Sequence, residues 1–112
     1  MNGSEFPFPA VSREGGRIVL QGPVTIEHVT GLTRQGIALF DNQSLTVDLA
    51  SVTDVDSTII SMLLEWLRAS QKNSQSLQFI NLPENLASLI QLYGVAELIP
   101  VNSAITPESA TV

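Results

Sequence analysis

Two carboxylates and two hydroxyls stand close together near the middle of the chain, in the run Asp54-Val55-Asp56-Ser57-Thr58. Carboxylates two residues apart can bind Mg²⁺, and one of them can act as a nucleophile toward a phosphate ester. The chemistry that suits this spacing is metal-assisted phosphoryl transfer. The surroundings of the run decide whether that chemistry is expected.

The run matches the D-x-D-x-T pattern of haloacid-dehalogenase-like phosphatases, but its context differs. In those enzymes the first Asp directly ends a buried strand, whereas we expect residues 50–53 to separate Asp54 from a strand that ends at Leu49. Those enzymes also need a distant Lys and a further acidic motif, and the only Lys, Lys72, is followed by no acidic pair. Cys is absent, which excludes a Cys/His arrangement, and we expect His28, the only histidine, to be a surface residue in the first turn of a helix. We therefore expect no catalytic residue, no metal and no cofactor.

The same run also suits the first turn of a helix. Asp56 or Ser57 can cap the helix, and its free N–H groups and positive dipole end favour an anionic group. A phosphate on Ser57 or Thr58 would be stabilised there. Spacing alone favours the simpler alternative, a cap without modification.

The helix expected over residues 57–72 has three faces when residues are placed at 100° intervals. Its buried stripe contains Ile59, Ile60, Leu63, Leu67 and Ser70, and its solvated face contains Ser61, Glu65, Arg68 and Lys72. Met62 and Trp66 lie between these faces as an apolar shoulder, of a kind favoured at interfaces, although a neighbouring helix of the same domain is an equal alternative. The partner-binding residues that we expect are Asp56, Ser57, Thr58, Ser61, Met62, Glu65 and Trp66.

Alternating strands and helices account for the rest of the chain. We expect strands at 17–21, 45–49 and 77–80, a helix over 26–40 capped by Thr25, a loop over 50–56, and a last helix from Pro83 to Gly94 with the apolar stripe Leu86, Leu89, Ile90 and Tyr93. Gly22-Pro23 is expected to close the first strand, and Gly31 and Gly36 to weaken the helix that follows. This order predicts an α/β fold with a parallel or mixed sheet, too small for a doubly wound nucleotide fold.

Composition limits the classes of partner. The chain has 112 residues, of which 44% are hydrophobic and 14% charged, and its net charge is −6 with only five Lys and Arg. We expect one domain over 11–101, flexible tails at 1–10 and 102–112, and a cloning remnant within 2–6. The few cations argue against nucleic acid and anionic lipid, and no apolar run is long enough for membrane insertion. The absence of Cys suits a cytoplasmic protein.

The stretch from Leu45 to Thr58 resembles the central motif of STAS domains, in which a strand, a loop and an Asp-Ser-Ser-Gly or Asp-Thr-Gly-Gly helix start follow one another. The closing stretch from Leu92 to Pro100 is most similar to MlaB-type subunits of the Mla lipid transporter. The resemblance implies a STAS-like (SpoIIAA-like) mixed sheet of about four strands with three or four helices. It places Thr58 where anti-sigma-factor antagonists have their phosphorylatable serine, and Ser57 where MlaB-type proteins have an important threonine.

Two functions follow from the resemblance. The first is a non-catalytic accessory subunit of a phospholipid ABC transporter, cytoplasmic and peripheral to the inner membrane through the complex, which binds the ATPase subunit through the helix that starts at Asp56. The second is an anti-sigma-factor antagonist that binds a kinase and is regulated by phosphorylation of Thr58 or Ser57. Ile59 and Ile60 replace the family's Gly-Leu, and we expect these bulky residues to obstruct a kinase. The closing stretch from Leu92 to Pro100 and the missing glycine together favour the first function.

Overall fold

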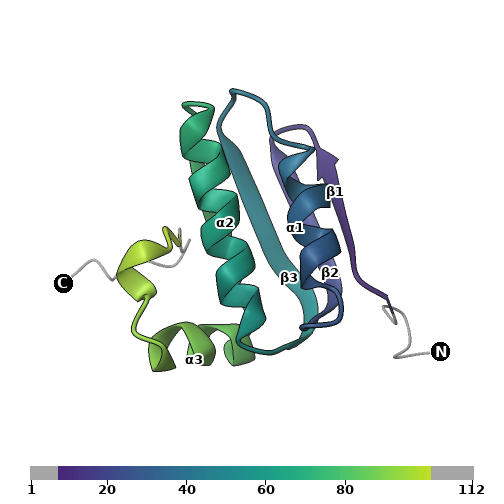
Figure 1. Cartoon of the computed structure of the whole chain (residues 1–112), viewed down its shortest axis with the longest axis vertical. Helices are drawn as coiled ribbons and strands as arrows, with labels where there is room; N and C mark the ends of the chain where they lie inside the picture. The colour runs from purple at the N-terminus through teal and green to yellow at the C-terminus, as the bar shows by residue number, and fades with distance from the viewer. Residues whose placement is uncertain (1–7, 102–112) are drawn as a thin grey trace.

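The computed structural model describes residues 8–101, so the expected cloning remnant at 2–6 and the tail at 102–112 lie outside the described residues. Within this part of the chain, a four-stranded sheet lies behind two helices, and a third helix lies beside the start of α2 (Figure 1). The elements in chain order are β1 (Ala10–Glu14), β2 (Arg17–Val24), α1 (Val29–Ile37), β3 (Leu45–Val55), α2 (Thr58–Lys72), β4 (Leu77–Ile80), α3 (Glu84–Leu92) and the short 3₁₀ helix η2 (Ala96–Leu98).

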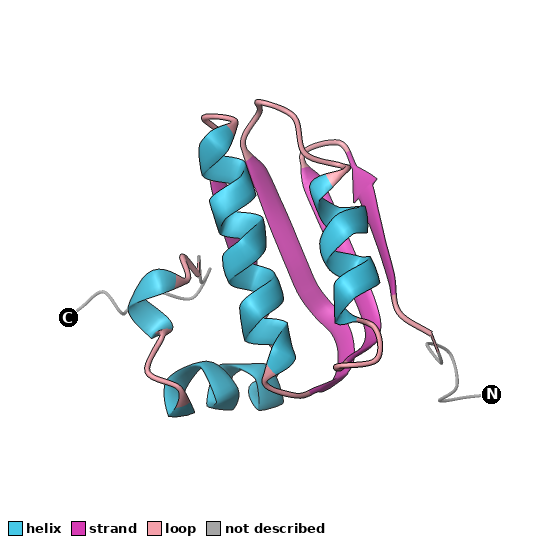
Figure 2. Ribbon diagram, viewed as in Figure 1, coloured by secondary structure: helices cyan, strands magenta, loops and turns pink. Residues whose placement is uncertain are grey.

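The sheet is mixed, as the sequence predicts. Its strand order is β1-β2-β3-β4, with β1 antiparallel to β2 and the other neighbours parallel (Figure 2). Val24 pairs with Val55 at the ends of β2 and β3. The loops that follow these two strands therefore leave the sheet side by side.

The first strand was not predicted from the sequence. β1 pairs with β2 from Ala10 opposite Gln21 to Glu14 opposite Arg17, which leaves the two-residue turn 15–16. Gly15 has a φ of +64°, as tight hairpin turns require. The Gly-Gly pair directly before the predicted strand at 17–21 is a signal that would have predicted this hairpin.

β2 and β3 are both longer than predicted. The expectation that Gly22-Pro23 ends β2 was wrong, because β1 reaches only to Gln21 and the missing N–H of Pro23 is not needed on that side. Gly22 has a φ of +87°, and a Cβ there would lie 2.8 Å from the carbonyl oxygen of Phe8. β3 continues to Val55, through most of the expected loop over 50–56.

Alternation along the strands separates a core face from an open face. Ile18, Leu20, Val47, Leu49 and Phe79 are fully buried beneath the helices. The opposite face carries polar residues, including an ion pair between Arg17 and Asp48 at 3.4 Å. The helices therefore cover one side of the sheet only (Figure 2).

The contact between α1 and α2 explains Gly36. A Cβ at Gly36 would overlap the ring of Trp66, so glycine is what allows the two helices to approach. Trp66 Nε1 donates to the Thr33 carbonyl at 3.1 Å, and the ring of Phe40 meets it edge-on at 6.3 Å. The helix cost expected for Gly36 is thus offset by packing.

Two helix predictions need correction at their ends. α1 begins at Val29 rather than 26 and ends at Ile37 rather than 40, and Ile26 is 69% exposed in the loop before it. α3 ends as predicted, with Gly94 at a φ of +68°, but Tyr93 is 54% exposed and does not belong to the buried stripe. No helix within residues 8–101 is both long and apolar enough to cross a membrane.

Candidate partner-binding site

The candidate site lies at the start of α2, where the loops after β2 and β3 meet. Asp56 joins them, because its Oδ2 accepts a hydrogen bond from the Ile26 N–H at 2.9 Å. α3 lies beside this end of α2 in Figure 1, and Asn85 Nδ2 donates to the Thr53 carbonyl at 3.1 Å. Two connections of the fold thus meet at the Asp56 carboxylate, and α3 is bonded to β3 close to it.

Asp56, rather than Ser57, caps α2. Its Oδ1 accepts from the Thr58 N–H at 3.0 Å and from the Thr58 hydroxyl, whereas the Ser57 side chain makes no capping bond. The sequence allowed either residue as the cap. The difference matters because the Ser57 hydroxyl is left available to another molecule.

The electrostatics of Asp56 follow from these hydrogen bonds. Partial burial on its own would raise the pKa of the carboxyl, but the bonds from the Thr58 hydroxyl, the Ile26 N–H and the Thr58 N–H outweigh it and lower the pKa below the ordinary value of 3.8. Asp56 is therefore a carboxylate at neutral pH. No cation in the described part of the chain contributes to this shift.

Ser57 and Thr58 lie in different surroundings. Ser57 is exposed, while Thr58 is half-buried and its hydroxyl donates to Asp56. A phosphate transferred to the Thr58 hydroxyl would remove that hydrogen-bond donor and place a second negative charge against Asp56. Of the two residues expected to be modification sites, Ser57 is the accessible one.

The faces of α2 agree largely with the prediction. The expected stripe of Ile59, Ile60, Leu63, Leu67 and Ser70 is buried, and Ser61, Glu65, Arg68 and Lys72 are exposed. Because Ile59 and Ile60 point into the core, the expectation that they obstruct the surface beside Thr58 was wrong.

Met62 and Trp66 do not form an exposed shoulder. Their exposed fractions are 1% and 0%, because α1 packs directly over this part of α2 at Gly36. Their assignment to a surface for direct partner contact was therefore wrong, and the alternative of a neighbouring helix was right. Asp56, Ser57, Thr58, Ser61 and Glu65 remain as candidates.

A groove between α1 and α2 adds residues that sequence reasoning missed. An open hollow of about 310 Å³ is lined by Val29, Thr30, Thr33, Arg34, Ser61, Met62 and Glu65. A second, of about 290 Å³, adjoins it at Glu65 and is lined also by Ile37, Arg68, Ala69, Lys72 and Asn73. Sequence reasoning had paired the helix at 57–72 with no specific neighbour, so nothing placed the α1 residues beside it.

The structure changes the argument about phosphoryl transfer in one respect. Asp54 lies on β3 itself, so the separation from a strand that we expected was wrong. Asp56, however, already accepts hydrogen bonds from the chain at both oxygens. Among residues 8–101, no three His, Asp or Glu side chains lie close enough to hold a metal ion.

His28 is half-buried before α1, with Nδ1 3.4 Å from the Thr25 hydroxyl.

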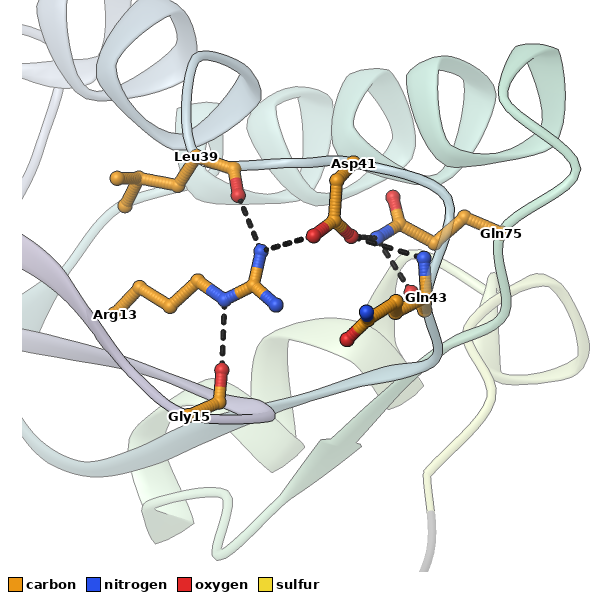
Figure 3. Close-up of polar contacts among 6 residues, drawn as sticks. All are labelled: Arg13, Gly15, Leu39, Asp41, Gln43 and Gln75. Carbon is orange, nitrogen blue, oxygen red and sulfur yellow. Dashed lines mark hydrogen bonds and ion pairs between the residues drawn. The ribbon is translucent and has the colours of Figure 1, made fainter.

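A second polar cluster lies at the other end of α1 and α2. Arg13 donates to the Leu39 carbonyl at 2.9 Å and to Asp41 Oδ2 at 3.0 Å, and Gln75 donates to Asp41 Oδ1 at 3.2 Å (Figure 3). A hydrogen bond from the Gln43 N–H, together with the charge of Arg13, lowers the pKa of Asp41. This cluster connects β1 with the loops that follow α1 and α2.

Comparison with known proteins agrees with this architecture. Three solved structures each match with a TM-score of 0.67 or 0.68: a STAS domain protein from Planctomyces limnophilus (14% identity, 90% of this chain and 93% of that one), a proposed anti-sigma factor antagonist from Thermotoga maritima (11%, 90% and 90%) and the anti-sigma factor antagonist SpoIIAA in its unphosphorylated form (12%, 91% and 92%). These identities show the fold alone.

The family comparison is more specific. No curated protein matches the chain significantly. The family model described as "Mlab, STAS domain" matches residues 9–100, which is most of the sequence. The chain therefore belongs to the STAS domain family.

Proposed function

We propose that this chain is the non-catalytic STAS subunit of a phospholipid ABC transporter and binds the ATPase subunit through the start of α2. The observation that carries the proposal is the match of residues 9–100 to the Mlab STAS family. The site supplies the surface: Ser57, Ser61 and Glu65 are exposed and follow one another at intervals of four residues along one face.

A binding role suits the chemistry of this site. The Asp56 carboxylate is committed to capping α2 and to holding the loop before α1. The hydroxyls of Ser57, directly before α2, and of Ser61, in its first turn, can pair with polar groups of another protein. The subunit would then stabilise or tune the assembled ATPase, on the cytoplasmic side of the inner membrane.

Co-purification with the ATPase subunit of a lipid ABC transporter from the same genome tests the proposal. We expect a stable complex with the wild-type chain and none with Ser61→Arg, because a long side chain would hold the partner away from α2. Ser12→Arg, on exposed β1, is the matched control and should keep the complex. Failure of the wild-type chain to bind this ATPase would contradict the proposal.

An anti-sigma-factor antagonist is the second candidate, favoured by the exposure of Ser57 at a helix start. A phosphate on Ser57 would meet the positive end of α2, but it would also stand beside the Asp56 carboxylate. That added charge could release a bound kinase. The similarity to SpoIIAA, at 12% identity, is a similarity of fold alone.

Phosphorylation by an anti-sigma-factor kinase of the same genome tests this candidate. Mass spectrometry should find phosphate in the wild-type chain and in Thr58→Ala but not in Ser57→Ala, because the Ser57 hydroxyl is the exposed one. Absence of phosphate from the wild-type chain would exclude regulation by that kinase.

A further inference from the structure

The cations of this acidic chain are unevenly distributed. The net charge is −6 with only five Lys and Arg. Three of the five, Arg34, Arg68 and Lys72, line the groove between α1 and α2. Among residues 8–101, Glu65 is the only carboxylate that lines the same groove. The groove is thus a positive strip on a negative protein.

Two of the groove cations have no charged partner in the described part of the chain. Arg13 and Arg17, away from the groove, are each paired with an aspartate. Arg68 pairs with Glu65 at 2.7 Å, and both side chains are largely in solvent. Arg34 and Lys72 form no ion pair with any residue from 8 to 101.

The floor of the groove is apolar enough to hold a hydrophobic side chain. Val29 contributes to the first hollow, and Ile37 and Ala69 to the second. The two hollows follow the seam between the helices, and α2 itself spans about 22 Å at 1.5 Å per residue. This length suits an amphipathic helix that inserts side chains one or two turns apart.

We propose that the groove between α1 and α2 receives an amphipathic helix of the partner protein that carries acidic residues beside its apolar stripe. The acidic residues pair with Arg34 and Lys72. Glu27 and Asp56 precede α1 and α2 at the opposite end of the two helices, and these carboxylates fix the direction in which the partner helix lies. This inference rests on the proposed function, because it specifies the chemistry of the surface that the partner presents.

Affinity measurements with the full chain test the pairing. The ATPase subunit named above is the first probe, and the anti-sigma-factor kinase is the second. Arg34→Gln combined with Lys72→Gln should weaken binding about fivefold at low salt and less at high salt, because rim charge pairs contribute modestly and are screened. Ser12→Glu combined with Ser76→Glu changes the net charge equally on other exposed positions and should leave the affinity within twofold.

Hydrogen exchange of the same complexes separates the possible outcomes. Protection of the amides along 29–37 and 61–72, together with the fivefold loss of affinity, supports the inference with either partner. If only the kinase binds and gives this result, the inference is supported while the transporter function fails. A complex with the ATPase that leaves the groove unprotected overturns the inference and leaves the proposed function standing. Failure of both partners to bind overturns both.

Discussion

The two ends of the α1–α2 layer each contain an aspartate with a lowered pKa, but they use it differently. Asp41 is joined to Arg13 of β1 and to Gln75 of the loop after α2. Asp56 accepts only from Ile26 and Thr58 and leaves Ser57 exposed beside it. The polar groups at the Asp41 end are hydrogen-bonded to one another and stabilise the fold, whereas the Asp56 end retains polar groups that a partner can contact.

The contact between the helices sets the distance between these two ends, and Gly36 is where it can be broken. Gly36→Ala should lower the free energy of unfolding by about 1–3 kcal/mol, because the new methyl group overlaps the buried Trp66 ring. Gly31→Ala is the matched control: nothing lies near its Cβ position, so it should stabilise the helix by up to about 1 kcal/mol. Urea unfolding measures both. Equal effects of the two substitutions would contradict the packing account.

Removal of the two aspartates tests the comparison itself. Asp56→Ala should lower the free energy of unfolding by about 1–2 kcal/mol, the usual value for a lost helix cap. Asp41→Ala should lower the thermal midpoint further, because it removes the ion pair with Arg13 and leaves the buried amide of Gln75 with one acceptor fewer. Asp54→Ala, on an exposed position, should change stability by less than about 0.5 kcal/mol. A larger loss at Asp54 than at Asp56 would refute this ranking.

Thr58→Val sharpens the account of Asp56. Loss of the hydroxyl donor should raise the pKa of Asp56 toward its ordinary value of 3.8, which a ¹³C carboxyl titration can follow. Because the folded-state pKa is depressed, the stabilisation is present above pH 3.8 and is lost as pH falls through the folded-state pKa. The stability difference between wild type and variant should therefore narrow on acidification. An unchanged Asp56 pKa would show that the hydroxyl is not its donor.

The sequence predicted α2 well because its pattern is strongly amphipathic, and its buried stripe needed no knowledge of the neighbours. It placed Met62 and Trp66 only provisionally, since their burial depends on how closely α1 approaches. The close approach of α1 depends on the absence of a side chain at Gly36. Helix propensity alone treats a glycine at this position only as a destabilising residue. The strand at Ala10–Glu14 was missed because a polar edge strand has little apolar alternation of its own.

The candidate site divides in the same way. Local spacing was sufficient to find the helix start at Asp56, because a cap and its first turn are neighbours in sequence. Residues on α1, such as Thr30 and Arg34, come to the groove from a segment about thirty positions away. Their place follows from the parallel pairing of β2 and β3, which single-sequence patterns do not fix.

The affinity of Ser57→Arg for the ATPase subunit tests the central claim most directly. Ser57 is exposed and makes no capping bond, so the thermal midpoint should stay unchanged. If the start of α2 is the docking surface, the dissociation constant measured by calorimetry should rise at least about tenfold, a loss of about 1.4 kcal/mol. Ser12→Arg should bind as the wild type does. Equal affinity of Ser57→Arg and wild type, with both folded, would contradict the account.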